Sequence, residues 1–155
     1  MLQRIQTLYL FLIVALMVAM MFLPLAVLQA GNELYSFDIF GVRATISPQP
    51  ELIYPVWGLF VLIAGIALLA ALTILLYKNR IRQIRICVFN AIIMIGFYGF
   101  FAFFIYLMKQ ETPELSVNVR IALSFPLISL ILDYLAIRNI GADEVLVRSI
   151  ERLRK

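Results

Sequence analysis

The chain has 155 residues, of which 64% are apolar and 14% are charged, with a net charge of +4 and a mean hydropathy of +1.00. Soluble domains average about 45–50% apolar and about 25% charged residues. A chain this short cannot bury so much apolar surface in one core. The composition therefore excludes an ordinary soluble protein and predicts a single membrane domain over residues 1–155.

Four stretches of the chain are long, apolar and almost free of charge. No charged side chain occurs in residues 5–32, 52–77 or 86–108, and residues 121–137 carry only Asp133. A bilayer core of about 30 Å needs roughly 20 helical residues. We predict an all-α membrane protein, a four-transmembrane-helix bundle, with helices near residues 5–28, 53–77, 84–108 and 117–137.

The residue types exclude several kinds of chemistry. The sequence has no His and one Cys, Cys87, which rules out imidazole catalysis, zinc–histidine sites, an internal disulfide and a cysteine metal cluster. Intramembrane hydrolysis needs a nucleophile with a base, a pair of acids or a metal. Because the apolar stretches hold one acid, we expect no enzymatic activity and no cofactor, and nothing in the sequence indicates contact with nucleic acid.

Basic residues gather on one side of the predicted membrane. Ten of the 13 lie before the first stretch, between the second and the third, or after the fourth. The other three are Arg43, Lys109 and Arg120. Since Lys and Arg are enriched in cytoplasmic loops, we expect a multi-pass protein in the lipid bilayer with both termini in the cytoplasm.

The connection between the first two stretches, Gly31–Glu51, is rich in strand-forming residues. Leu34–Phe40 alternates weakly, Gly41 offers a turn, and Val42–Ile46 resumes the pattern. We predict a small extracytoplasmic β-hairpin that rests on the helix ends as a cap, because a two-stranded hairpin is marginal alone. The chain would then return to the membrane through Pro48, Pro50 and Pro55.

Small residues recur at helical spacing within the predicted spans, and such residues let transmembrane helices pack closely. We therefore expect helix contacts at Ala15, Ala19, Ala64, Ala67, Ala71, Gly96, Gly99 and Ala102. We also expect Pro126 to bend the fourth helix, because proline removes a backbone donor.

Asp133 is the one acid inside a predicted span. A charge at the centre of a membrane helix costs about 2.5–3.5 kcal/mol on insertion scales. We expect a smaller cost here, because the predicted helix places Asp133 near its cytoplasmic end. Our hypothesis is a polar lock in which Arg85 and Asn90 contact Asp133, and the alternative is a proton or ion site.

The C-terminal tail, residues 138–155, is amphipathic. Its apolar stripe consists of Ala142, Leu146, Ile150 and Leu153. We expect a separate cytoplasmic amphipathic helix that starts after a break at Gly141, with Asp143 as its N-cap. Two roles remain open, a helix that lies on anionic lipid and a docking helix for a protein partner.

Both ends of the chain resemble a known family. The opening segment Met1–Leu10 and the closing segment Arg138–Arg154 carry the resemblance, together with Gln83–Cys87 and Asn90. The family consists of small four-span inner-membrane proteins of Bacteroidota that are catalogued only as a domain of unknown function. The resemblance implies four spans and the bacterial inner membrane, and it implies no activity.

We expect a non-enzymatic accessory or scaffold subunit of a larger inner-membrane complex, and a secretion or translocation complex is one candidate partner. The subunit would dock through its cytoplasmic surface, at Gln3, Arg4, Gln6, Asp143, Glu144, Arg148, Arg152 and Arg154. The alternative is a carrier or binding protein for a small solute or a lipid. Such a carrier needs a polar route, for which the spans offer Thr73, Tyr77, Asn90, Ser124 and Asp133.

Overall fold

The computed structural model describes residues 2–45, 52–77 and 79–153, and within them all side chains except those of residues 2–4, 52–54, 148 and 150–153. The described residues form four α-helices, five β-strands and one 3-10 turn. In chain order these are α1 (Leu2–Met20), β1 (Ala26–Ala30), β2 (Glu33–Asp38), β3 (Gly41–Ala44), β4 (Leu52–Pro55), α2 (Trp57–Leu75), α3 (Arg80–Glu111), β5 (Ser116–Val119), η1 (Ile121–Ser124) and α4 (Phe125–Leu153).

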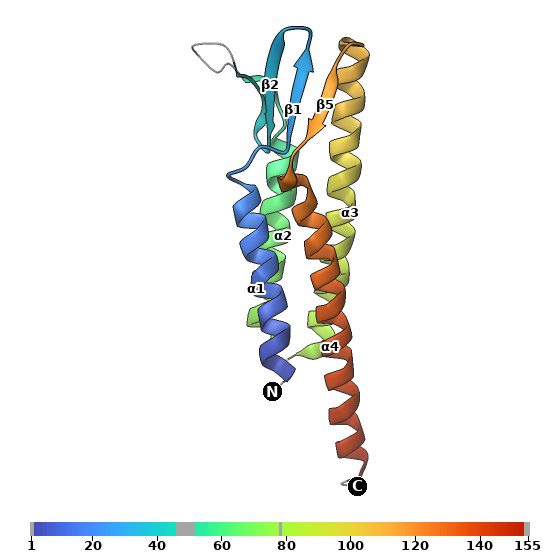
Figure 1. Ribbon diagram of the computed structural model, residues 1–155. Coiled ribbons are helices and arrows are strands. Elements are labelled where there is room, and N and C mark those ends of the chain that lie inside the picture. The colour runs from blue at the N-terminus through green and yellow to red at the C-terminus, as the bar shows by residue number, and fades with distance from the viewer. Residues whose placement is uncertain (1, 46–51, 78, 154–155) are drawn as a thin grey trace.

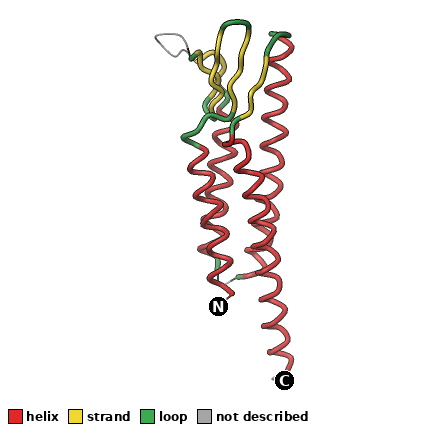
Figure 2. Tube along the Cα trace, in the orientation of Figure 1, coloured by secondary structure: helices red, strands yellow, loops and turns green. Residues whose placement is uncertain are grey.

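The four described helices pack side by side as a bundle. α1 and α3 each contact both α2 and α4. The sheet covers one end of the bundle, here called the sheet end, and the start of α1 and the turn between α2 and α3 lie at the other, the terminal end (Figure 1). Two helices are longer than the bundle, because α3 continues beside the sheet and α4 continues past the terminal end (Figure 2).

Large apolar side chains fill the interior of the bundle. Examples are Leu10, Ile13, Met17, Leu59, Ile63, Ile66, Met94 and Phe97, none of which is more than 1% exposed. The predicted contact faces of small residues are therefore largely wrong. Ala15, Ala19 and Ala102 are exposed, and a Cβ added at Gly96 or Gly99 would meet no other side chain within 4 Å. Interlocking Leu, Ile, Met and Phe side chains hold the helices together instead.

The sheet is larger than the predicted hairpin. The described strands lie in the order β4-β3-β2-β1-β5 and all neighbours are antiparallel. The hairpin itself is confirmed, because β2 pairs with β3 and Phe37 lies opposite Val42. The predicted return through Pro48 and Pro50 falls outside the described residues, and Pro55 ends β4.

Two predicted helix ends are strands. The first helix was expected to reach residue 28 but ends at Met20, and Ala26–Ala30 forms β1. The fourth was expected from residue 117, yet Ser116–Val119 forms β5. β1 pairs with β2 on one side and β5 on the other, so its backbone groups are satisfied without a helix.

Three of the described helical segments are long and apolar enough to cross a membrane. They are Trp57–Leu75, Arg80–Glu111 and Ile121–Val147. The apolar part of α1, Ile5–Met20, is shorter than these three. Length and composition thus indicate a membrane protein, as the apolar stretches predicted.

α4 differs from its prediction in two respects. Pro126 is the second residue of α4 and lies in its first turn, where a proline is tolerated, so it does not interrupt the helix. The expected break at Gly141 is also wrong, because α4 runs unbroken from Phe125 to Leu153. One glycine costs a helix only about 1 kcal/mol, which the packing of α4 on α1 and α3 offsets.

Candidate functional site

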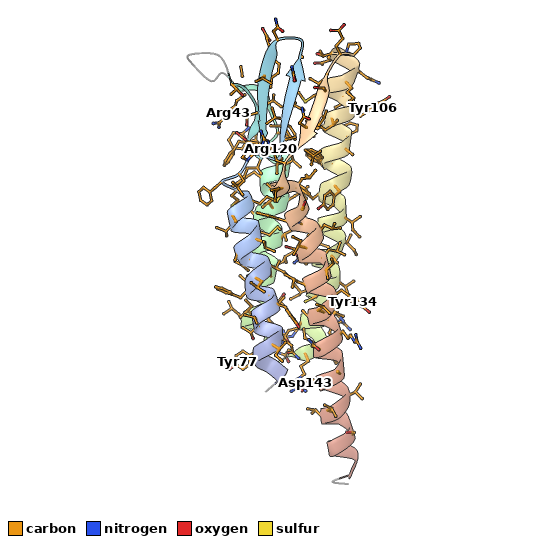
Figure 3. The ribbon with its side chains drawn as sticks, in the orientation of Figure 1. Arg43, Tyr77, Tyr106, Arg120, Tyr134 and Asp143 are labelled. Atoms are coloured by element: carbon orange, nitrogen blue, oxygen red, sulfur yellow. The ribbon has the colours of Figure 1, made fainter. Side chains whose placement is uncertain are left out.

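An ion pair marks the point where α4 leaves the bundle. Arg80, the first residue of α3, has its Nη2 3.1 Å from Asp143 Oδ2 on α4. Its Nη1 also donates to the backbone oxygen of Asp143 at 3.0 Å. Asp143 lies at the terminal end (Figure 3) and pairs with a neighbouring helix, so the prediction that it caps a separate helix is wrong.

Beyond Asp143, α4 projects from the bundle for ten further residues, which is about 15 Å. Three consecutive apolar residues of this extension are exposed, Val145, Leu146 and Val147. Glu144 and Val147 line one side of a groove whose other side comes from the α2–α3 turn and the start of α3. Tyr77 and Asn79 line it from the turn, and Arg80, Ile81 and Arg82 line it from the first residues of α3.

The predicted docking residues have different surroundings. Gln6 is only 6% exposed, so its assignment to an exposed docking surface is wrong. Asp143 contacts Arg80, whereas Glu144 lines the groove. The remaining candidates have side chains outside the described residues, and these are Gln3, Arg4, Arg148, Arg152 and Arg154.

Polar side chains also occur inside the bundle. Those buried among the described residues are Gln6, Thr73, Gln83, Asn90, Ser129 and Asp133. Two of them form hydrogen bonds to backbone oxygens, because Thr73 Oγ1 donates to Leu69 O at 2.7 Å and Gln83 Nε2 donates to Thr73 O at 2.9 Å. The second of these bonds joins the end of α2 to the start of α3.

No hydrogen bond of the predicted polar lock is present among the described residues, because neither carboxyl oxygen of Asp133 has a partner. Asn90 and Asp133 are 1% and 0% exposed, but Arg85 is exposed and does not belong to the interior. The inward stripe of α3 consists of Gln83, Cys87, Asn90, Met94, Phe97 and Phe101. Arg85 is two residues from Gln83 and from Cys87, a rotation of about 200° around a helix, so it faces outward.

Asn90 and Asp133 lie at the same level on neighbouring antiparallel helices. The Arg80–Asp143 pair sets the register of α3 and α4, and Asn90 and Asp133 are each ten residues, about 15 Å, along the helices from that pair. Asp133 is also about 12 Å from the start of α4. It therefore lies near the middle of the bundle, and the expectation that it lies close to one end is wrong.

Several atoms in this interior have no hydrogen-bond partner. They are Asn90 Oδ1, Ser129 Oγ and both carboxyl oxygens of Asp133, which we call the polar centre, and Gln6 Nε2 nearer the terminal end. Cys87 is close enough to Asp133 to interact with it electrostatically. Ser129, one helical turn before Asp133, was not predicted, although its spacing of four residues would have identified it.

Hydrogen bonds also connect the sheet end to the helices. Tyr98 on α3 donates to the backbone oxygen of Leu123 at 2.7 Å, and Arg120 N donates to Leu25 O at 2.9 Å. Arg43 and Arg120 both lie at this end (Figure 3), away from Asp143.

A small pocket lies between the sheet and the last turns of α3. It is lined by Ala30, Tyr35, Val42, Met108, Glu111, Thr112 and Leu115. On its sheet side Tyr35 donates a hydrogen bond to Glu33. This bond, together with burial and the nearby negative charge, raises the pKa of Tyr35 above its ordinary value.

Comparison with known proteins agrees with the resemblance of the terminal segments. A search among the curated proteins gives no match. A family model matches residues 2–153, which is nearly the whole chain. The chain therefore belongs to the family described as Domain of unknown function (DUF4293).

Proposed function

We propose that this protein is a non-enzymatic accessory subunit of a larger assembly in the bacterial inner membrane, and that it docks through its terminal end. In this proposal α1 is a fourth span and both termini are cytoplasmic. The asymmetry of the basic residues supports this orientation, because ten of 13 lie along the sequence before Ile5, between Tyr77 and Ile86, or after Ile137.

The main support for this proposal is the α4 extension, which is the part of α4 that follows Asp143 and projects from the bundle. A helix end that serves only to close a bundle would stop at the level of the Arg80–Asp143 pair, yet α4 continues for about 15 Å. Val145 and Leu146 on it are 67% and 52% exposed. Exposed apolar side chains on a projecting helix, next to a groove with charged walls, are typical of a helix that binds a partner.

A photo-crosslinking amino acid at two positions of α4 tests this proposal in cells. Placed at Val145, on the extension, the crosslinker should capture a discrete protein partner. Placed at Ile131, which is 55% exposed on the same helix but within the bundle, it should react with lipid. Equal capture of the same protein from both positions, or lipid alone at both, would contradict docking through the extension.

Charge-preserving substitutions separate protein docking from attraction to lipid. Changing Arg4, Arg148, Arg152 and Arg154 together to Lys keeps the net charge, so lipid attraction of about 1 kcal/mol per residue is retained. A protein partner that uses the planar fork of Arg should be lost. The control is Arg43→Lys with Arg120→Lys at the sheet end, which should retain the partner. Retention in both variants would reduce the surface to a lipid anchor.

A carrier for a small solute or lipid is the second candidate, and the unpartnered polar atoms inside the bundle favour it. A carrier must hold its cargo between the helices. Native mass spectrometry of the protein ejected from nanodiscs should then reveal a retained small molecule that Asn90→Leu removes. Ejection of the bare chain would count against this candidate.

A further inference from the structure

Asp133 is a buried acid that has no salt-bridge partner among the described side chains. The side chain is 0% exposed, and neither carboxyl oxygen has a hydrogen-bond partner of ordinary geometry, although the Cys87 thiol on α3 lies near enough to be a weak donor to the carboxyl group. An ionised carboxylate at such a site loses its hydration, and a bare charge in an apolar interior is far more costly than a neutral polar group. Either a positive charge or a proton must therefore accompany Asp133.

No positive side chain faces Asp133 among the residues whose side chains are described. From α3 it meets the stripe that holds Cys87 and Asn90. From α1 the inward face offers Gln6 and apolar residues, and η1 consists of Ile121, Ala122, Leu123 and Ser124. The nearest arginine by sequence on α3, Arg85, is exposed. The described side chains thus leave the proton as the neutralising partner.

Among the four unpaired atoms of the polar centre, Ser129 Oγ carries a proton that it can donate, and the other three are acceptors only while Asp133 is ionised. Asn90 Oδ1 is an acceptor without a donor, and an ionised Asp133 would add only further acceptors. A protonated carboxyl has one O–H to donate. A single proton on Asp133 would therefore remove the charge and supply the donor that Asn90 Oδ1 lacks.

We infer that Asp133 binds a proton in the folded protein and remains a neutral acid, and that its O–H donates to Asn90 Oδ1 on the facing helix. The site is a proton-binding site formed between α3 and α4, and the resulting hydrogen bond joins these two helices near the middle of the bundle. It does not depend on the proposed docking function.

Infrared spectroscopy of the protein in lipid nanodiscs at neutral pH tests this inference directly. A protonated carboxyl has a C=O stretching band above the amide region that shifts in deuterated water. We expect this band in the wild-type protein and its loss in Asp133→Asn. Asn90→Leu should retain the band and move it to higher frequency, because the carboxyl loses its acceptor. A wild-type protein without the band carries an ionised Asp133 and overturns the inference.

Thermal unfolding provides a second measurement that does not depend on one variant. Asp133→Asn keeps the shape and a donor, so its Tm should stay close to that of the wild type, whereas Asp133→Leu should lower it. Replacing sodium and potassium by choline should leave the wild-type Tm unchanged. A Tm that falls in choline would identify a metal cation, and not a proton, as the partner of Asp133 and would also overturn the inference.

Discussion

Arg80 and Asp143 make a two-point contact between the start of α3 and the middle of α4, with Nη2 3.1 Å from Oδ2 and Nη1 3.0 Å from the Asp143 backbone oxygen. The two bonds engage both the side chain and the backbone of Asp143, and the planar guanidinium fixes their relative direction. Because α4 leaves the bundle at this level, the contact determines the direction in which the extension projects.

Arg80→Ala should loosen the α4 extension more than it destabilises the bundle. The two side chains are 21% and 15% exposed, so solvent screens the pair and its loss should cost about 1 kcal/mol or less. Hydrogen exchange of residues 143–153 should accelerate, while exchange of the bundle core stays unchanged. Arg82→Ala, at an exposed arginine two residues away, is the matched control. Equal acceleration in both variants would mean that the Arg80–Asp143 contact does not hold the extension.

The limits of the spans were predictable where an apolar stretch is followed directly by charged residues. α2 and α3 begin and end within four residues of their predicted limits, and the basic residues from Lys78 to Arg85 mark the boundary between the two helices. The end of α1 at Met20 was predictable from Pro24, because helices usually end at or before the residue that precedes a proline. That the apolar residues after Pro24 form a strand was not predictable locally, since it depends on pairing of β1 with β5, almost 90 residues away.

Tyr35 should titrate at higher pH in the folded protein than a free tyrosine. Its hydrogen bond to Glu33 is the largest cause, followed by burial and the negative charge of Glu33. A raised pKa means that the protonated form is favoured by folding. The stabilisation is therefore complete below the ordinary value of about 10 and is lost as the pH rises through the folded value.

Ultraviolet absorbance titration can isolate the ionisation of Tyr35. The contribution of Tyr35 is the difference between the wild type and Tyr35→Phe, since the chain has seven tyrosines. Glu33→Gln should lower the pKa of Tyr35, because it removes the negative charge and weakens the acceptor. An unchanged pKa in Glu33→Gln would show that Glu33 is not the cause.

A side chain at Gly58 on α2 would collide with the ring of Phe100 on α3. A Cβ there would lie 2.5 Å from Cζ of Phe100, whose ring also contacts Phe104 with centroids 4.9 Å apart. Gly58→Ala should therefore destabilise the protein by about 1–3 kcal/mol, as overpacked cores do. Its Tm in detergent should fall accordingly.

Gly65 is the matched control on the same helix. A Cβ at Gly65 would meet no atom within 4 Å, so Gly65→Ala should stabilise α2 by about 0.5–1 kcal/mol through its better helix propensity. Phe100→Leu in the Gly58→Ala background should restore part of the lost stability. If Gly58→Ala and Gly65→Ala behave alike, the close approach of Phe100 is not a constraint.

Two of the three residues of the polar centre, Asn90 and Asp133, were predicted from the sequence, and Ser129 was missed. Polar residues in an apolar stretch identified Asn90 and Asp133, because such residues are costly inside a membrane unless they have a polar partner or a function. Helical phase would have excluded Arg85, since the inward stripe of α3 runs through Gln83, Cys87 and Asn90. The depth of Asp133 was not predictable, because it depends on α4 beginning eight residues later than expected, after β5 and η1.

Cysteine labelling should locate the two ends of the bundle on opposite sides of the membrane. Asn79 lies in the exposed turn at the terminal end, and Asn118 is exposed on β5 at the sheet end. The native Cys87 is buried, so the unmodified protein serves as the unlabelled background. With both termini cytoplasmic, a membrane-impermeant maleimide added to intact spheroplasts should label Asn118→Cys and leave Asn79→Cys unmodified.

Permeabilised spheroplasts should label both variants. Labelling of Asn79→Cys alone in intact spheroplasts would reverse the orientation, and labelling of both there would mean that the bundle does not separate these two ends by a bilayer.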